Sequence, residues 1–160
     1  SKRTIAQIRA EIRKHQLDAV NKNQLVLIDY LQLITPTTLR KERRDLEIGE
    51  ITRELKLLAM ELEIPIVLLS QLSRSVETRQ DKRPLMSDLR ESGNIEQDAD
   101  VIALLYRDDY YNKDSKKKNV LEVIISKHRN GPTGVVEMEF LREYGRVREL
   151  RQREGKLVGI

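Results

Sequence analysis

The sequence contains no cysteine and no tryptophan, and only one of its 160 residues is phenylalanine. Without cysteine the chain can form neither disulfides nor thiolate metal sites, which fits a reducing compartment. Five tyrosines are then the main aromatic side chains available for stacking on bases. No apolar run exceeds six residues, so neither a signal peptide nor a membrane span is expected.

An excess of charge of one sign is also lacking. There are 30 basic and 26 acidic residues, for a net charge of +4. So small a balance does not by itself indicate nucleic-acid binding, and the positions of the charges must carry that argument. The apolar content of 39% is enough to form the core of one domain.

The most informative segment that is present runs from Leu25 to Ile34, where an apolar stretch is interrupted by Asp29. Such a run predicts a strand over 25–29 that is buried on both faces of a parallel α/β sheet. Open α/β sheets bind their ligands beyond the carboxyl ends of the strands. A carboxylate there can hold Mg²⁺ beside the phosphates of a nucleotide, although Asp29 could instead begin a turn.

The remaining periodicities predict an α/β fold with a mostly parallel sheet flanked by helices and a C-terminal antiparallel hairpin. Three parallel strands would place Asp29, Gln71 and the loop after Tyr106 at one edge of the sheet. Residues 35–44 are expected to form an exposed basic loop, and Gly93 to interrupt a short helical region over 87–98. Helices are expected at about 5–15 and from 45 to the residue before Pro65, and strands at 66–69, 101–106, 120–126 and 135–140.

Six short motifs occur in a fixed order and spacing. They are VLIDYLQL at 26–33, LSQLSR at 69–74, RQDKRP at 79–84, SDLRESG at 87–93, IEQDAD at 95–100 and KHRNGP at 127–132. Together they resemble the C-terminal ATPase domain of the replicative DNA helicases of the DnaB type, a RecA-like fold of the P-loop NTPase type. The resemblance covers about residues 1 to 148. It implies that residues 1–150 are the C-terminal part of this motor domain. The composition of residues 151–160 predicts a basic, mobile tail.

One element of the family pattern is missing. No phosphate-cradling G-x-x-x-x-G-K-[ST] loop occurs, and Gly49 is the first glycine. The chain is therefore interpreted as a partial domain that lacks the first strand and its loop, and no residue is assigned as the catalytic glutamate. Alone it should bind nucleotide poorly and hydrolyse almost nothing.

The resemblance implies an ATP-dependent, Mg²⁺-dependent DNA helicase that acts as a homo-oligomeric ring, expected to be hexameric. Such a ring would travel 5′→3′ on single-stranded DNA, with primase and a helicase loader as partners. It would work in the cytoplasm of a bacterial or phage-infected cell, away from membranes. Two alternatives stay open: another RecA-like ATPase, such as a recombinase or phage primase–helicase, and a non-catalytic DNA-binding or assembly module.

By this resemblance Asp29 would be the Walker-B-type carboxylate that holds Mg²⁺ through water. Gln71 would sense the γ-phosphate or the attacking water, or else simply close its strand. Lys127 and Arg129 stand two residues apart on an extended segment, so their side chains leave on the same side. The family places them at the neighbouring subunit's nucleotide, with Arg129 as the arginine finger, whereas a hairpin with solvated charges is the alternative.

For DNA, the resemblance points to Arg90, Glu91 and Gly93, with Gly93 allowing close approach of the backbone to a phosphate. Glu91 could orient Arg90 or bond through a bridging arrangement. The basic loop 40–44 fits DNA and a solvated surface equally well. Residues 116–118 (three lysines) are predicted to be a solvated turn, His128 to be structural, and zinc is not expected because no histidine pair has ligand spacing.

Overall fold

The computed structural model describes residues 3–18, 24–36, 44–89 and 92–150. Its longest elements are helices α1 (Ile5–Asp18) and α2 (Arg44–Leu62), which cover one face of a parallel strand pair, β2 (Val26–Ile28) and β4 (Ile66–Leu68). A second, very short parallel pair joins β1 (Arg3–Thr4) to β3 (Ile34–Thr35). The third sheet is antiparallel, with the order β5 (Val101–Tyr106), β6 (Val120–His128), β7 (Gly134–Leu141) and β8 (Arg146–Glu149).

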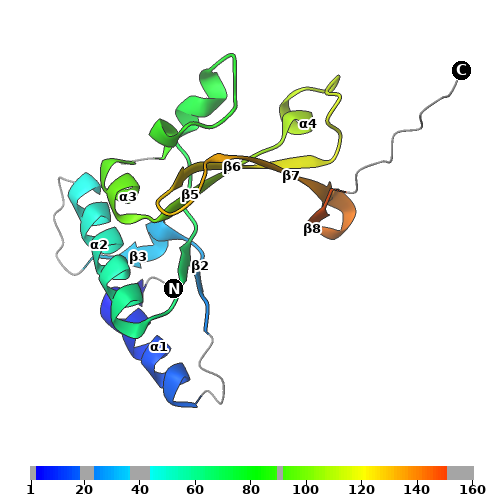
Figure 1. Ribbon diagram of the computed structural model, residues 1–160. Coiled ribbons are helices and arrows are strands. Elements are labelled where there is room, and N and C mark those ends of the chain that lie inside the picture. Colours follow the sequence, from blue (N-terminus) through cyan, green and yellow to red (C-terminus); the bar gives the residue numbers. More distant parts are fainter. Residues whose placement is uncertain (1–2, 19–23, 37–43, 90–91, 151–160) are drawn as a thin grey trace, which may run out of the picture.

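Short helical turns connect these strands. The 3₁₀ turns are η1 (Leu31–Leu33), η2 (Arg74–Thr78), η3 (Met86–Asp88) and η4 (Arg142–Tyr144), and the short α-helices are α3 (Ser92–Asp98) and α4 (Asp108–Tyr111). In Figure 1 the antiparallel sheet crosses one end of the α1–α2 layer, and α3 lies beside the β6–β7 hairpin end of that sheet. None of the described helices is long and apolar enough to cross a membrane.

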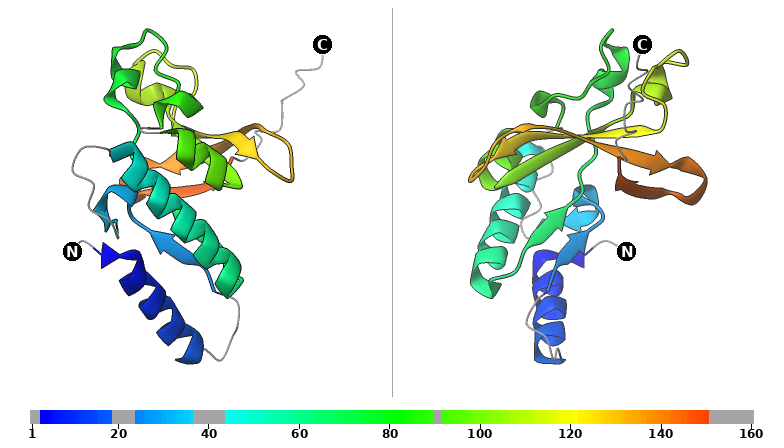
Figure 2. Two further views of the ribbon diagram at one scale, coloured as in Figure 1. Left: turned by 90° about the vertical axis from the view of Figure 1, so that its left-hand side faces the viewer. Right: turned by 45° about the vertical axis from the view of Figure 1, so that its right-hand side comes forward.

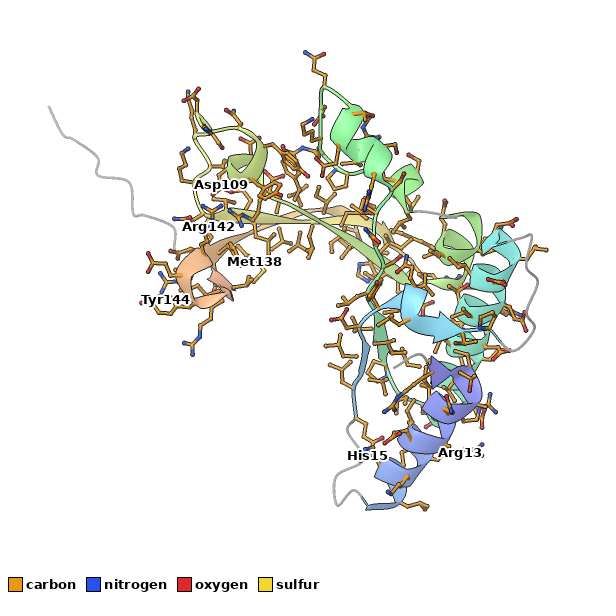
Figure 3. All side chains as sticks on the ribbon, turned by 180° about the vertical axis from the view of Figure 1, so that it is seen from behind. Arg13, His15, Asp109, Met138, Arg142 and Tyr144 are labelled. Atoms are coloured by element: carbon orange, nitrogen blue, oxygen red, sulfur yellow. The ribbon has the colours of Figure 1, made fainter. Side chains whose placement is uncertain are left out.

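The molecule is drawn out between two ends. Figure 3 shows Arg13 and His15 near the end of α1, whereas Met138, Arg142 and Tyr144 lie at the far end of the antiparallel sheet. Figure 2 shows α1 and α2 on the same side of the β2–β4 pair. Their contact forms the core, whose fully buried members include Ile5, Ile48, Ile51 and Leu58.

The two long helices begin at or next to the predicted residues and α2 ends before Pro65 as predicted, but α1 continues to Asp18, beyond the predicted end at about residue 15. The backbone N–H of Thr4 donates to Gln7 Oε1 (2.9 Å) and that of Gln7 to Thr4 Oγ1 (3.3 Å), a reciprocal capping box at the start of α1. Helix α2 stops at Leu62, and Glu63 then takes a positive φ of 53° before Pro65. The predicted hairpin over 120–126 and 135–140 is confirmed by the β6–β7 pairing.

The prediction that the first strands are buried on both faces is wrong for the described residues. The exposures alternate: Val26, Ile28, Ile66 and Leu68 pack on the helix-covered core, while Leu27 and Val67 on the other face are 64% and 43% exposed. No described element packs against this second face. The apolar run therefore belongs to a strand pair with one covered face and one open face.

The third strand also departs from expectation. We expected β5 to extend the parallel pair, but among the described strands it pairs only with β6, in the antiparallel sense. The short connection over 107–119 returns the chain directly alongside β5, which favours antiparallel pairing of neighbours in sequence. In the described part of the chain, β4 pairs only with β2 and β5 pairs only with β6. The other edge of each of these two strands, β4 and β5, has no partner strand there. The α/β class with a C-terminal antiparallel set is nonetheless confirmed.

Three local expectations need correction. Gly93 does not interrupt a helix but is the second residue of α3, where a missing side chain costs little because the first turn is not yet hydrogen-bonded. Thr35 belongs to β3, Pro36 is buried and Arg44 begins α2, so these three residues are not part of the predicted exposed loop, and residues 37–43 lie outside the described residues. The strand β8 was not predicted. The proposed tail at 151–160 lies outside the described residues.

Candidate functional site

Asp29 and Gln71 lie at the same end of the β2–β4 pair. Asp29 directly follows β2, and Gln71 follows β4 by three residues. The register continues past the strands, because the Leu69 N–H donates to Ile28 O (3.0 Å) and the Leu31 N–H to Leu69 O (2.8 Å). This brings the two predicted nucleotide-site residues to one edge of the parallel pair, as expected.

The Asp29 side chain is exposed, and within the described residues it has no hydrogen-bond or ion-pair partner. A hard oxygen ligand on a strand end, free to accept metal-bound water, suits Mg²⁺. The described residues contain no group of three or more His, Cys, Asp or Glu side chains that could hold a metal ion by themselves. Asp29 therefore fits a Mg²⁺ ion whose remaining ligands are water and phosphate oxygens.

Two buried polar atoms belong to the segments that follow β2 and β4. Gln32 Oε1, in η1, and Ser70 Oγ, between β4 and Gln71, have no hydrogen-bond partner among the described residues. Buried polar atoms are paired in most native structures, so these two segments have unused hydrogen-bonding capacity. The sequence offered a signal we did not use, since each is a polar residue next to leucines in an apolar stretch.

Lys127 and Arg129 lie on the antiparallel sheet and approach α3. Lys127 Nζ donates to the backbone oxygen of Glu96, and Arg129 Nη2 donates to that of Gln97 (3.2 Å). These carbonyls belong to the last turn of α3, which carries the negative end of the helix dipole. The prediction that both side chains leave the strand on the same side is confirmed. His128 instead contacts the hairpin loop, with Nδ1 3.3 Å from Pro132 O.

Asp100, between α3 and β5, is the carboxylate of this cluster. Its Oδ1 lies 3.3 Å from Arg129 Nη1, and its Oδ2 accepts a 2.5 Å hydrogen bond from Lys56 Nζ on α2. The hydrogen bond from Lys56 holds the pKa of Asp100 below its usual value, and the charges of Arg129 and Lys127 lower the pKa further. Asp100 belongs to the IEQDAD motif, but no role was predicted for it.

Asp29 and Gln71 follow strands of the parallel pair, whereas Lys127 and Arg129 lie at the end of β6 in the antiparallel sheet. Among the described residues no hydrogen bond or ion pair joins Asp29 to Lys127 or Arg129; those two cations contact α3 and Asp100 instead. The arrangement is compatible with each serving a different nucleotide.

Most of the predicted DNA-contacting residues lie outside the described residues. Arg90 and Glu91 do, as do residues 40–43 of the basic loop, and nothing is described of the Arg44 side chain. Gly93 is exposed, and among the described residues a Cβ placed on it would meet no atom within 4 Å apart from its own chain neighbours and helix backbone. The backbone at Gly93 is thus open to an approaching ligand.

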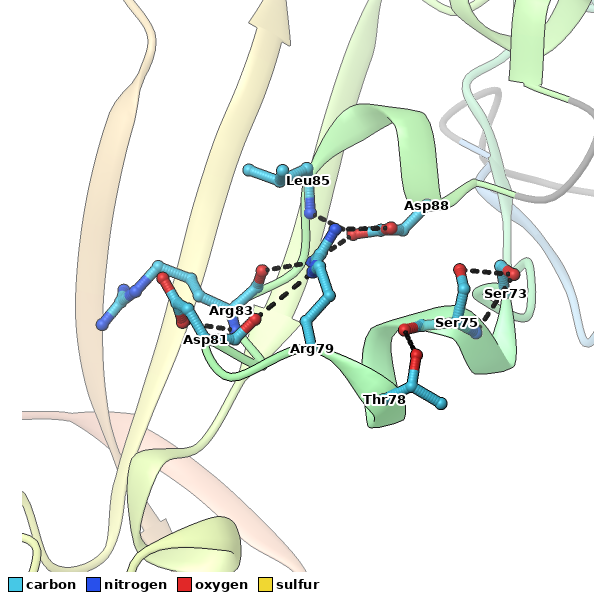
Figure 4. A network of polar contacts seen from close by, with 8 residues as sticks. All are labelled: Ser73, Ser75, Thr78, Arg79, Asp81, Arg83, Leu85 and Asp88. Atoms are coloured by element: carbon cyan, nitrogen blue, oxygen red, sulfur yellow. Dashed lines mark hydrogen bonds and ion pairs between the residues drawn. The ribbon is translucent and has the colours of Figure 1, made fainter.

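A network of hydrogen bonds holds the segment 73–89, which connects Gln71 to the region before α3 (Figure 4). Both guanidinium nitrogens of Arg79 contact the buried Asp88 carboxylate, at 2.9 and 2.7 Å, and Arg79 Nη2 also donates to Arg83 O (2.9 Å). Asp88 Oδ2 accepts from the Leu85 N–H as well (2.7 Å). The fork of Arg79 thereby fixes the path of the segment.

Glu122 on β6 attaches this segment to the antiparallel sheet. The residue is 1% exposed and accepts hydrogen bonds from Arg83 and from Lys117 Nζ (2.8 Å). Lys117 also contacts Glu137 (2.5 Å). The predicted solvated turn over residues 116–118 agrees with the exposure of all three lysines, and Lys117 in addition pairs with the buried Glu122 carboxylate.

The fold and the polar groups at its strand ends define an α/β nucleotide-binding type of domain. Residues 1–149 match the family model of the DnaB-like helicase C terminal domain. The chain is 56% identical to the replicative DNA helicase DnaB of Geobacillus stearothermophilus and 53% identical to the replicative DNA helicase DnaC of Bacillus subtilis (strain 168), over 149 residues in each case.

A solved structure of a DnaB-like replicative helicase and its interactions with primase superposes with a TM-score of 0.88 and 50% identity, covering 92% of this chain and 35% of that one. The two curated relatives are matched over 93% of this chain and 32% of their own length. The chain thus spans about a third of these relatives. It belongs to the DnaB-like helicase C-terminal domain family, whose activity depends on nucleotide.

Proposed function

We propose that this chain is the C-terminal part of the motor domain of an ATP-dependent replicative DNA helicase. The observation that carries the proposal is the placement of Asp29 and Gln71 at one edge of the β2–β4 pair, where α/β sheets bind their ligands. Lys127 and Arg129 lie at the end of the first strand of the antiparallel hairpin, and their polar contacts among the described residues are with α3 and Asp100. The names of the relatives, replicative DNA helicases, support the same function.

At the edge of the β2–β4 pair, Asp29 would hold Mg²⁺ through water beside the phosphates of ATP. The ion would neutralise phosphate charge that develops in the transition state. Gln71 would hydrogen-bond the γ-phosphate or the attacking water, and the unpaired Gln32 and Ser70 oxygens lie close enough in sequence to join that network. The phosphate-binding loop would come from the full-length protein, because this chain lacks its motif.

Lys127 and Arg129 would act on the nucleotide of the neighbouring subunit, with Arg129 stabilising the transferred phosphoryl group. A monomer would then be inactive, and a closed homo-oligomeric ring, hexameric in our proposal, would be required. Such a ring would surround single-stranded DNA and travel 5′→3′, with Arg90, Glu91 and Gly93 contacting the backbone of the strand.

Primase is a proposed partner because a matched solved structure describes a DnaB-like helicase with its interactions with primase. A helicase loader is proposed on the family resemblance alone. We propose that the ring works in the cytoplasm of a bacterial or phage-infected cell.

A subunit-mixing experiment tests the proposal with the full-length protein. Asp29→Asn would disable the ATP site of its own subunit, and Arg129→Ala the site of a neighbour, so each variant alone should lose nearly all ATP turnover. In mixed rings, an Asp29 from one variant meets an Arg129 from the other at some interfaces. Turnover should therefore reappear on mixing, as measured by DNA-stimulated phosphate release.

The controls distinguish an ATP site shared between two subunits from an ATP site formed within one subunit. Each variant must form rings of the same size as the unmodified protein in sedimentation experiments. Mixed rings that stay inactive after verified subunit exchange would contradict a site shared between subunits. Turnover of Arg129→Ala alone at the unmodified rate would remove Arg129 from the reaction.

A further inference from the structure

We propose that Asp100 is a positioning residue that orients the Arg129 guanidinium toward the neighbouring subunit's nucleotide. The inference rests on the proposed role of Arg129 and adds a residue to it. The juxtaposition that carries it joins three elements far apart in sequence: Lys56 on α2, Asp100 before β5 and Arg129 at the end of β6.

Arg129 is held at three points. Its backbone N–H donates to Asp100 O (2.8 Å), which fixes the start of the side chain against the segment between α3 and β5. Its Nη2 donates a hydrogen bond to Gln97 O (3.2 Å), and its Nη1 forms an ion pair with Asp100 Oδ1 at 3.3 Å. The hydrogen bond and the ion pair act on the two arms and together restrict the plane of the guanidinium. Three of its five N–H donors remain for phosphate oxygens.

The Asp100 carboxylate is itself held by the core. Its second oxygen accepts the 2.5 Å hydrogen bond from Lys56, whose side chain is only 23% exposed. Lys56 follows the buried Leu55 on α2, so its stem starts from a rigid helix. The orientation of the Arg129 side chain is thereby fixed relative to α2 and not only relative to the hairpin.

A carboxylate beside a phosphate-binding arginine could repel the phosphate, but the local charge argues otherwise. Lys56, Lys127 and Arg129 supply three positive charges against the single negative charge of Asp100. The Arg129 and Asp100 side chains are each 50% exposed, so their ion pair is weak and screened by solvent. Such a pair can restrict the rotamers of Arg129 without withholding it from an incoming anion.

The test uses the full-length helicase and DNA-stimulated ATP hydrolysis. Asp100→Asn keeps the shape of the side chain but removes its charge, and we expect kcat to fall about 10- to 100-fold. The KM for ATP should stay within about twofold, because a group acting on the transition state in the neighbour affects kcat rather than nucleotide binding. The melting temperature should hardly change for so exposed a pair.

Glu96→Gln is the matched control. It removes one negative charge from α3, while only the backbone oxygen of Glu96, and not its carboxylate, contacts Lys127. Glu96→Gln should therefore keep the unmodified kcat. In an Arg129→Lys background, Asp100→Asn should lower kcat by less than about twofold more, because lysine has no planar fork to orient.

Each outcome decides the matter. An unchanged or raised kcat for Asp100→Asn, or an equal loss for Glu96→Gln, overturns the positioning role while leaving Arg129 as the finger. If Arg129→Ala itself keeps full turnover, the proposed function of Arg129 fails, and the role of Asp100 fails with it. Loss of kcat confined to Asp100→Asn, and absent from the Arg129→Lys background, supports the proposal.

Discussion

Three carboxylates in this chain have three different surroundings. Asp29 is exposed at a strand end and has no partner among the described residues, whereas Asp100 is half exposed between Lys56 and Arg129. Glu122 is buried and held by Arg83 and Lys117. The surroundings suit three tasks: holding a hydrated metal ion, orienting a neighbour and attaching one segment of the fold to another.

The buried carboxylate predicts a dependence of stability on pH. Burial alone would raise the pKa of Glu122, but hydrogen bonds from Arg83 and Lys117 outweigh it and lower the pKa below 4.5. The charged form is thus favoured by folding. Its contribution to the free energy of unfolding is complete above about pH 5 and is lost as the pH falls through the lowered pKa.

Glu122→Gln should flatten this part of the pH dependence, because the amide does not titrate. We expect the difference in unfolding free energy between the unmodified protein and the variant to shrink on acidification from about pH 5 to pH 3. Urea unfolding at several pH values measures it. A difference that is constant over that range would show that the carboxylate is not held in its charged form.

At the scale of elements, apolar periodicity and capping predicted α1, α2 and the β6–β7 hairpin. They could not show that Leu27 and Val67 are exposed, because an apolar run looks the same whether or not a second layer covers it. The pairing of β5 with β6 was missed for a related reason. The order of strands in a sheet depends on which other strands pair between them. The composition of a single strand does not contain that information.

The segment 73–89 gives a prediction for a single element. Arg79→Lys should loosen it, because an ammonium cannot reproduce the two-armed contact with Asp88 or reach Arg83 O at the same time. Amide hydrogen exchange within the segment should become about 5- to 30-fold faster, equivalent to a loss of about 1 to 2 kcal/mol.

Arg74→Lys is the matched control, since Arg74 is exposed on η2 of the same segment and forms no described hydrogen bond or ion pair. Its exchange rates should match those of the unmodified protein. Equal acceleration in both variants would mean that the fork of Arg79 does not hold the segment.

At the scale of the whole molecule, six short motifs and their spacing were enough to predict the family, while the roles given to the site residues stay predictions. The contacts of Lys127 and Arg129 with α3 could not be predicted, since they join residues 31 and 32 positions apart. The role of Asp100 depends on those contacts. The proposed role could be inferred only from the contacts that join α2, the segment before β5 and the end of the β6 strand.

The proposed path of DNA through the ring can be tested by salt dependence. In the full-length protein, Arg90→Ala should weaken single-stranded DNA binding about equally for all sequences. The slope of log affinity against log salt should become shallower by about 0.7, the value for losing one phosphate contact on a single strand. Fluorescence anisotropy with two unrelated oligonucleotides measures both effects, and an unchanged slope would remove Arg90 from the contacts.

Helix α3 has a consequence for how such a motor could work. Its first residue adjoins Arg90 and Glu91, and its last carbonyls accept hydrogen bonds from Lys127 and Arg129. Seven residues of helix measure only about 10 Å. If both ends act as proposed, ATP hydrolysis in the neighbouring subunit and binding of the DNA strand would be coupled through one short helix. A tilt of that helix would move both of its ends together, so no longer chain of contacts would be needed.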